Sequence, residues 1–230
     1  LENSFGKRTL TGDIFGYYTL PINKTCDIDW IRSEAMRAAD PDVFFPNYTQ
    51  IILAGPFSGC GWAGVAQVGD GTISGADGFF TGGNSWIASM TTGVVGHELG
   101  HAFGVWHANF YDCDTEILKD SGCSSVGYGD EFDIMGRSSS NGHMNAYHKE
   151  TLGFFDASNV IEVSSSGSYT IEPIENSTVA PQILKIKKDY LNKFDYIEYR
   201  QPIGKDSVFS SSVLDGAMIH VARWFIGQGD

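Results

Sequence analysis

Apolar side chains recur at helical spacing in several segments of the chain. Between residues 27 and 39 they fall three or four positions apart with charged residues between them, at Ile28, Ile31, Ala35 and Met36. This pattern predicts an amphipathic helix. A second helix is expected to begin at Thr91 or Thr92, where a hydroxyl can cap it, and to run to about Phe103. A shorter helix is expected within residues 145–155.

Alternating or continuous apolar runs predict strands elsewhere. Residues 7–20 are rich in β-branched and aromatic side chains and are expected to form one or two strands, and residues 48–55 a buried strand. Residues 60–86 are rich in glycine, which indicates turns and close backbone approach, and a short edge strand is expected at 62–68. From residue 156 onward, short apolar runs between polar turns predict antiparallel strands.

This order of elements predicts an α+β protein in two parts, residues 1–155 and a β-rich subdomain at 156–230 that we expect to continue beyond the last residue. The chain has 230 residues, 42% of them hydrophobic, which is enough for a full core. A formal net charge of −13 argues against nucleic acid and anionic membranes as partners. No apolar run approaches the roughly 18 residues that would span a bilayer. The first residues lack a signal-peptide pattern, so any such segment or propeptide is expected to precede them.

The cysteines and the glycosylation sequons favour an oxidising, extracellular setting. Four cysteines allow two disulfides in three pairings. We favour Cys113 with Cys123, because that bond would stiffen a short loop, and this leaves Cys26 with Cys60. Asn-x-Ser/Thr sequons mark three candidate glycosylation sites at Asn23, Asn47 and Asn176.

The most informative stretch is HELGHAFGVWH, residues 97–107. His97 and His101 are four apart, so on a helix they share one face and can bind one zinc ion. Glu98 places a carboxylate beside the metal, and Gly104 lets the helix stop and the chain turn back. His107 can then reach the same ion. Three histidine ligands leave the fourth position open for water, as in a catalytic zinc site.

The polar residues of the chain allow other interpretations. A structural zinc site is disfavoured, because Cys113 and Cys123 complete no obvious set of four ligands. Asp70 and Asp77 could bind calcium, but as Asp-Gly pairs in a glycine-rich stretch they are better interpreted as turns. Two further histidines, His143 and His148, could be ligands or transition-state donors, although solvated histidines are the simpler interpretation.

Together these residues resemble the metzincin clan of zinc peptidases. The resemblance rests on the histidine pattern with Glu98 and Gly104, followed by Met135 in a tight Asp-Ile-Met-Gly turn. Within the clan, the chain is most similar to the gametolysin family, in the segments SFGKRTLTGDIFGYYTLP, CGWAGVAQVG, YGDEFDIMG and MNAYHKETLGF. The resemblance implies a zincin fold with a twisted mixed β-sheet, an active-site helix, and a Met-turn that places Met135 beneath the zinc.

The resemblance also implies a reaction. Glu98 would act as the general base for attack of a zinc-bound water on a peptide bond, and the substrate would lie extended along the edge strand. The gametolysin family is secreted and degrades cell-wall and matrix glycoproteins. The expected protein is therefore a secreted zinc endopeptidase with a polypeptide substrate. A non-catalytic extracellular structural or adhesive module on the same scaffold is the alternative.

Three features depart from the clan's pattern. Ala108 follows the third histidine, where several metzincin families have an acidic, Ser or Pro residue. Arg137 lies two positions beyond Met135, where astacins and serralysins have a tyrosine ligand, so no tyrosine ligand is assigned. Gametolysin-like domains also usually begin with a strand and a helix before the SFGKRTLTG-like segment, and this sequence does not contain them.

Overall fold

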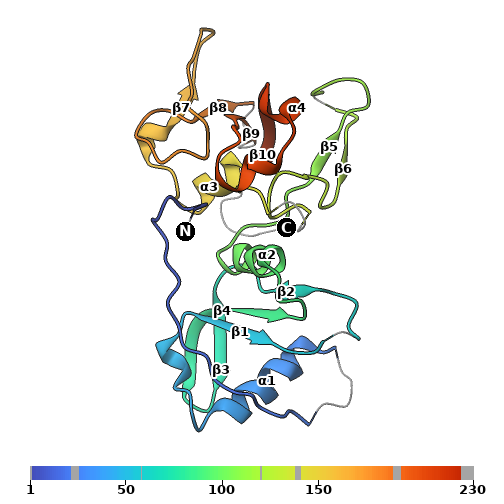
Figure 1. Ribbon diagram of the computed structural model, residues 1–230, viewed down its shortest axis with the longest axis vertical. Coiled ribbons are helices and arrows are strands. Elements are labelled where there is room, and N and C mark those ends of the chain that lie inside the picture. The colour runs from blue at the N-terminus through green and yellow to red at the C-terminus, as the bar shows by residue number, and fades with distance from the viewer. Residues whose placement is uncertain are drawn as a thin grey trace. The chain divides into compact units, whose positions relative to one another are not determined.

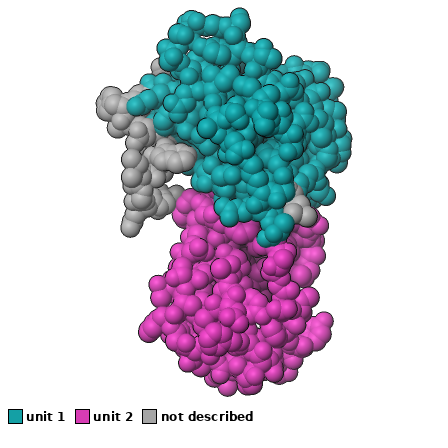
Figure 2. Space-filling model, turned by 90° about the vertical axis from the view of Figure 1, so that its left-hand side faces the viewer, with its two compact units in different colours: residues 1–9, 107–230 teal, residues 10–106 magenta. Residues whose placement is uncertain are grey.

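The computed structural model describes residues 2–21, 26–57, 59–119, 121–137, 141–188 and 193–223. The chain forms two compact units, which Figure 2 distinguishes by colour: unit 1 is Leu1–Thr9 with His107–Asp230, and unit 2 is Leu10–Trp106. The boundary expected at residues 155 and 156 falls inside unit 1.

Unit 2 is built on a four-stranded mixed sheet. Its strands are β1 (Gln50–Ala54), β2 (Gly64–Ala66), β3 (Gly71–Gly75) and β4 (Gly78–Ile87). The long strand β4 pairs with all three others, parallel to β1 and antiparallel to β2 and β3. The strands expected at 48–55 and 62–68 are thus confirmed as β1 and β2. The β3–β4 hairpin was not predicted, because its glycines conceal the strand pattern.

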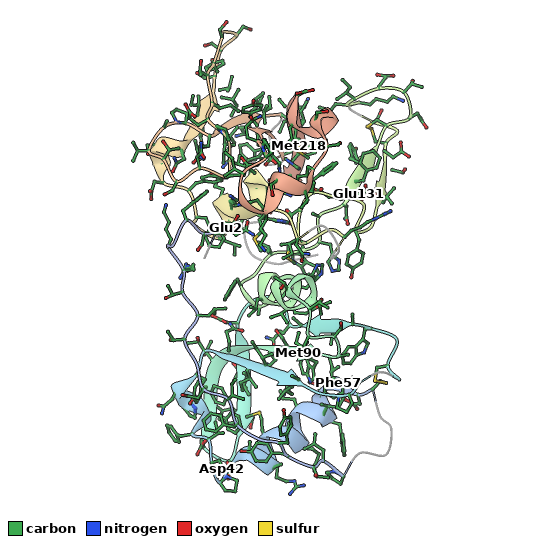
Figure 3. The ribbon with its side chains drawn as sticks, viewed as in Figure 1. Glu2, Asp42, Phe57, Met90, Glu131 and Met218 are labelled. Carbon is green, nitrogen blue, oxygen red and sulfur yellow. A yellow bond between two sulfur atoms is a disulfide. The ribbon has the colours of Figure 1, made fainter. Side chains whose placement is uncertain are left out.

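Helices cover both faces of this sheet in Figure 1: α1 (Ile28–Ala39) on one and α2 (Thr92–Ala102) on the other. Both helices were predicted. The carboxylate of Asp27 caps α1 by accepting the N–H of Trp30 at 3.0 Å. The short 3-10 helix Phe45–Asn47 leads into β1. Two apolar clusters form the core of the unit, one with Ile31, Phe57 and Trp86 and the other with Met36, Ala39, Val43, Phe45, Ile51 and Ile73; Phe57 is labelled in Figure 3.

The strands expected at residues 7–20 do not form. This segment is attached by side chains and not by a backbone ladder. The hydroxyl of Tyr18 donates to Asp42 at 2.8 Å, and that of Tyr48 donates to Asp13 at 2.7 Å. Its β-branched and aromatic residues therefore do not produce a strand here, because β propensity depends on a neighbouring strand against which to pack.

Unit 1 contains a second four-stranded sheet. Its strands are β7 (Val160–Val163), β8 (Ile183–Lys187), β9 (Lys193–Tyr199) and β10 (Ala217–Arg223), in the order β10-β9-β8-β7. The prediction of antiparallel strands is confirmed for β8, β9 and β10. Strand β7 was not among the predicted strands, and it runs parallel to β8. Another strand was expected at residues 168–174, but the chain forms none there. The side chain of Ile174 is fully buried, and the backbone N–H of Ile174 donates to the carbonyl of Tyr199.

The remaining elements of unit 1 are short. Strands β5 (Phe110–Asp112) and β6 (Ser124–Val126) form an antiparallel pair. The helix expected within 145–155 is α3 (Ala146–Thr151), and the other short helices are Ala157–Asn159, Gly204–Val208 and α4 (Ser211–Leu214). The protein is therefore α+β, with mixed sheets and few helices. No helix in the described part of the chain is long and apolar enough to cross a membrane.

Candidate metal centre

The helix α2 has well-defined ends on either side of its two histidines. At its start, the hydroxyl of Thr91 accepts the N–H of Val94 at 3.3 Å. At its end, Gly104 has φ +106°. The N–H of Gly104 donates to the carbonyl of His101, and the N–H of Val105 donates to the carbonyl of Gly100. This pair of bonds is a Schellman motif, which requires a left-handed residue where the helix stops. The role predicted for Gly104 is confirmed.

The structure brings the three predicted histidines together. Each of His97, His101 and His107 offers a ring nitrogen, and these nitrogens lie within 4.8 Å of one another. His97 and His101 are buried and His107 is half-buried. In the described residues this is the one group of histidine, cysteine or carboxylate side chains found that could hold a metal ion. Imidazole nitrogens suit zinc, copper, iron and nickel alike, so the group fits a transition metal.

The imidazole of His101 is held in a defined orientation. Its Nδ1 lies 2.9 Å from the carbonyl oxygen of Val105, and Nδ1 must carry the proton for this bond to form. Nε2 is then the unprotonated nitrogen that can bind a metal, an arrangement common among ligating histidines. The bond also links the helix to the turn that follows it, since Val105 comes directly after Gly104.

Glu98 is a buried carboxylate next to the first histidine, His97. Its side chain is 6% exposed, and its Oε2 has no hydrogen-bond partner among the described residues. Burial raises the pKa of Glu98 to about 7 in the metal-free chain. The carboxylate lies against strand β2, where a Cβ placed on Gly64 would be 2.7 Å from its Cγ and its Oε1. Only a glycine at this position leaves room for Glu98 as it stands.

Met135 lies in a tight turn tied to the chain just after His107. The N–H of Ala108 donates to the carbonyl of Met135 at 3.0 Å, and the side chain of Met135 is completely buried. The turn is shaped by Asp133, whose Oδ1 accepts the N–H of Met135 at 2.7 Å. Arg137, beyond the turn, pairs with Glu131 at 3.0 Å. These contacts define the turn, and the position of Met135 beneath a metal stays a prediction.

Two histidines interpreted as solvated are in fact buried. His143 and His148 are 1% and 3% exposed. Nδ1 of His148 lies 2.8 Å from Oδ2 of Asp133, and Nδ1 of His143 lies 3.1 Å from Nζ of Lys149. Neither belongs to the metal-binding group. Both instead belong to a buried polar network in unit 1, which the sequence pattern did not reveal.

The structure also locates the other residues singled out in the sequence. Both expected disulfides are present, Cys26–Cys60 and Cys113–Cys123. Asn47 is exposed and Asn176 half-buried, whereas Asn23 lies outside the described residues. Asp77 accepts the N–H of Phe45 at 3.2 Å, and Asp70 accepts from the Gln50 amide at 3.4 Å. Asp77 lies in the turn between β3 and β4, as the turn interpretation predicts, whereas Asp70 directly precedes β3 and is not in a turn. Calcium binding at these aspartates stays untested.

Three residues around the centre were not predicted. Asp133 could have been found, because the side chain of an aspartate commonly accepts the backbone N–H of the residue two positions later, which here is Met135. Gly64 carried no specific signal among the many glycines of residues 60–86. Tyr128, whose ring lies against that of His107, is 21 positions away in sequence and could not be linked to it without the structure.

Comparisons with family models, with curated proteins and with solved structures find no match to this chain.

Proposed function

We propose that this protein is a zinc-dependent endopeptidase. The observation that carries the proposal is the convergence of three histidine nitrogens within 4.8 Å of one another, with a buried carboxylate directly following the first histidine. Three imidazoles with a position left for water are typical of catalytic zinc sites, whereas structural sites are closed by four protein ligands.

The donor set fits zinc. All three ligands are imidazoles, and the Nδ1 of His101 is already engaged by the carbonyl of Val105, which leaves Nε2 for the metal. When bound, zinc supplies a Lewis acid that makes its water acidic and stabilises negative charge on the substrate oxygen. His97, His101 and His107 would hold it.

Glu98 would act as the general base. Its Oε2 accepts no hydrogen bond from the described residues, so it is available to take a proton from the attacking water. The same carboxylate can then deliver that proton to the departing amine. Gly64 keeps the strand β2 close enough to hold Glu98 in place without a clash.

Strand β2 offers a place for the substrate backbone. It ends the strand order β1-β4-β2, so its outer edge can pair with an extended peptide. The resemblance to metzincins, and within them to gametolysins, supports a zincin fold and a secreted enzyme acting on extracellular or cell-wall and matrix glycoproteins. Two disulfides are compatible with that location.

The test separates metal binding from cleavage. Glu98→Gln removes the base but keeps the side chain's size, so the purified variant should bind one zinc and lose peptide cleavage by about 10²- to 10⁴-fold. The matched control is Glu131→Gln, a surface carboxylate paired with Arg137, which should cleave like the unsubstituted chain. Cleavage of a diverse peptide pool is followed with and without a chelator. A zinc-loaded chain that cleaves no peptide after removal of any propeptide would favour a non-catalytic module.

A further inference from the structure

The aromatic ring of Tyr128 lies directly against the third histidine. The ring centroids of Tyr128 and His107 are 3.8 Å apart, with 37° between the ring planes. Tyr128 is 48% exposed, so one part of its ring meets His107 while another meets solvent. Neither the sequence pattern nor the peptidase proposal assigns this tyrosine a role.

The backbone of Tyr128 has a conformation that tyrosine rarely adopts. Its φ is +57°, in the left-handed region that favours glycine, asparagine and aspartate. It is the third residue of a turn in which the N–H of Gly129 donates to the carbonyl of Val126 at 3.0 Å. A positive φ at the third position of a turn usually calls for glycine. A glycine flanks Tyr128 on each side, so the strained position carries a large ring where glycine would fit best.

The strained turn is tied to the segment that follows His107. The N–H of Tyr128 donates to Oδ1 of Asn109 at 2.9 Å, and the N–H of Asp130 donates to the carbonyl of Ala108 at 3.3 Å. Strands β5 and β6, which pair Phe110 with Val126, continue this connection. The turn is therefore fixed relative to His107, and its one bulky side chain covers that imidazole.

His107 is placed differently from the other two histidines. His97 and His101 project from a capped helix, and His101 is also held through Nδ1. His107 lies beyond the turn that ends the helix, on a connecting segment, and is half-buried. Fixing the plane of a ligand's ring before the metal arrives lowers the cost of binding, and groups that orient ligands affect metal affinity strongly.

We infer that Tyr128 is a positioning residue, whose ring holds the imidazole of His107 in the orientation that binds the metal. This inference rests on the proposed zinc centre. The aromatic face of Tyr128 has this role, and its hydroxyl does not. The strained backbone at Tyr128 is then explained by the need to place the ring against His107.

The test measures zinc affinity of the purified chain by competition with a chelating dye, with no substrate present. Tyr128→Asn and Tyr128→Gly both accept the positive φ, so they remove the ring without disturbing the turn. Each should bind zinc roughly 10-fold more weakly, at the lower end of the effect of residues that orient ligands. Tyr128→Phe keeps the ring and should stay within about 2-fold of the unsubstituted chain. Tyr169→Asn is the control, since the Tyr169 hydroxyl donates within its own turn to Ser165, and its affinity should not change.

Each result decides the inference. Unchanged affinity in Tyr128→Asn and Tyr128→Gly would overturn it, and so would a loss in Tyr128→Phe as large as in Tyr128→Asn, which would assign the effect to the hydroxyl. Circular dichroism of each variant verifies that the fold is retained. If the unsubstituted chain binds zinc but cleaves no peptide, the peptidase proposal fails while the role of Tyr128 is still measured. If it binds no zinc, both fail.

Discussion

Nδ1 of His148 lies 2.8 Å from Oδ2 of Asp133, and both side chains are almost completely buried. The same carboxylate accepts the N–H of Asn145 at 2.8 Å and the N–H of Met135 at 2.7 Å. Burial by itself would raise the pKa of Asp133, but the charge of His148 and these hydrogen bonds outweigh it, so the pKa lies below its ordinary value. One carboxylate thus joins the turn at Met135 to the start of α3.

Replacing Asp133 by asparagine should destabilise unit 1 and loosen this turn. Asparagine is neutral and cannot accept all of these bonds, and breaking one partner of a buried pair costs about 3–5 kcal/mol. The free energy of unfolding, measured in urea, should fall by that amount. Asp114→Asn is the control, because Asp114 is exposed and pairs with Lys119 at 3.5 Å, where such pairs contribute less than about 1 kcal/mol. Equal losses in the two variants would contradict the assigned role.

Adding one methyl group at Gly64 should impair cleavage while sparing the metal. The new Cβ would lie 2.7 Å from Oε1 of Glu98, so the carboxylate must move. Misplacing a catalytic group by about 1 Å can cost on the order of 100-fold in rate. We expect Gly64→Ala to lose peptide cleavage by at least about 10-fold and to bind zinc normally. Gly59→Ala, where a Cβ meets nothing within 4 Å, should behave like the unsubstituted chain. Full activity in Gly64→Ala would show that this close approach is unimportant.

Local patterns in the sequence predicted the elements and the histidine group that depend on near neighbours. The helices at 28–39 and 92–102, the stop at Gly104 and the three histidines follow from spacing and capping within a few residues. Both disulfides were also expected. What the sequence did not predict depends on contacts between distant segments. The segment at 7–20 lacks a partner strand, and the glycines around β3 and β4 hide a hairpin.

The same division applies to the candidate site. Glu98 could be assigned from its position beside His97, but its need for Gly64 could not, because the two lie 34 residues apart. The two histidines expected to be solvated, His143 and His148, are buried because Lys149 and Asp133 provide polar partners for them. The spacing of polar residues along a sequence does not predict which of them are buried, so a network of this kind is seen only in the structure.

Removing the disulfide Cys113–Cys123 should cost less stability than removing Cys26–Cys60. The bonds join residues 10 and 34 positions apart in sequence. Loop-closure entropy then predicts about 3 kcal/mol for the shorter loop and about 4 kcal/mol for the longer. Double serine variants at each pair, unfolded in urea, give the comparison. A larger loss at Cys113–Cys123 would mean that this bond also supports native contacts, of which the β5–β6 pair is the nearest.

Lys149 should make the stability of the protein depend on pH above neutrality. It is completely buried, its Nζ donates to the carbonyl of Ile174 at 2.7 Å, and it lies 4.3 Å from the ring centroid of Phe5. Burial, and then the charge of Arg200, lower the pKa of Lys149 to about 7. In the unfolded chain a lysine keeps its proton up to about pH 10.4.

Between pH 7 and pH 10 the unfolded state therefore binds more protons at this position than the folded state. The contribution of Lys149 to the free energy of unfolding must rise with pH over this range, by at most about 4 kcal/mol. Lys149→Met removes the titrating group, so the unsubstituted chain should gain stability relative to this variant as the pH is raised. Urea unfolding at pH values of about 7, 8, 9 and 10 measures the difference in free energy of unfolding between the two chains. Lys187→Met, at an exposed lysine of β8, should give a profile parallel to that of the unsubstituted chain. A constant difference between the Lys149→Met variant and the unsubstituted chain would show that Lys149 stays charged in the folded protein.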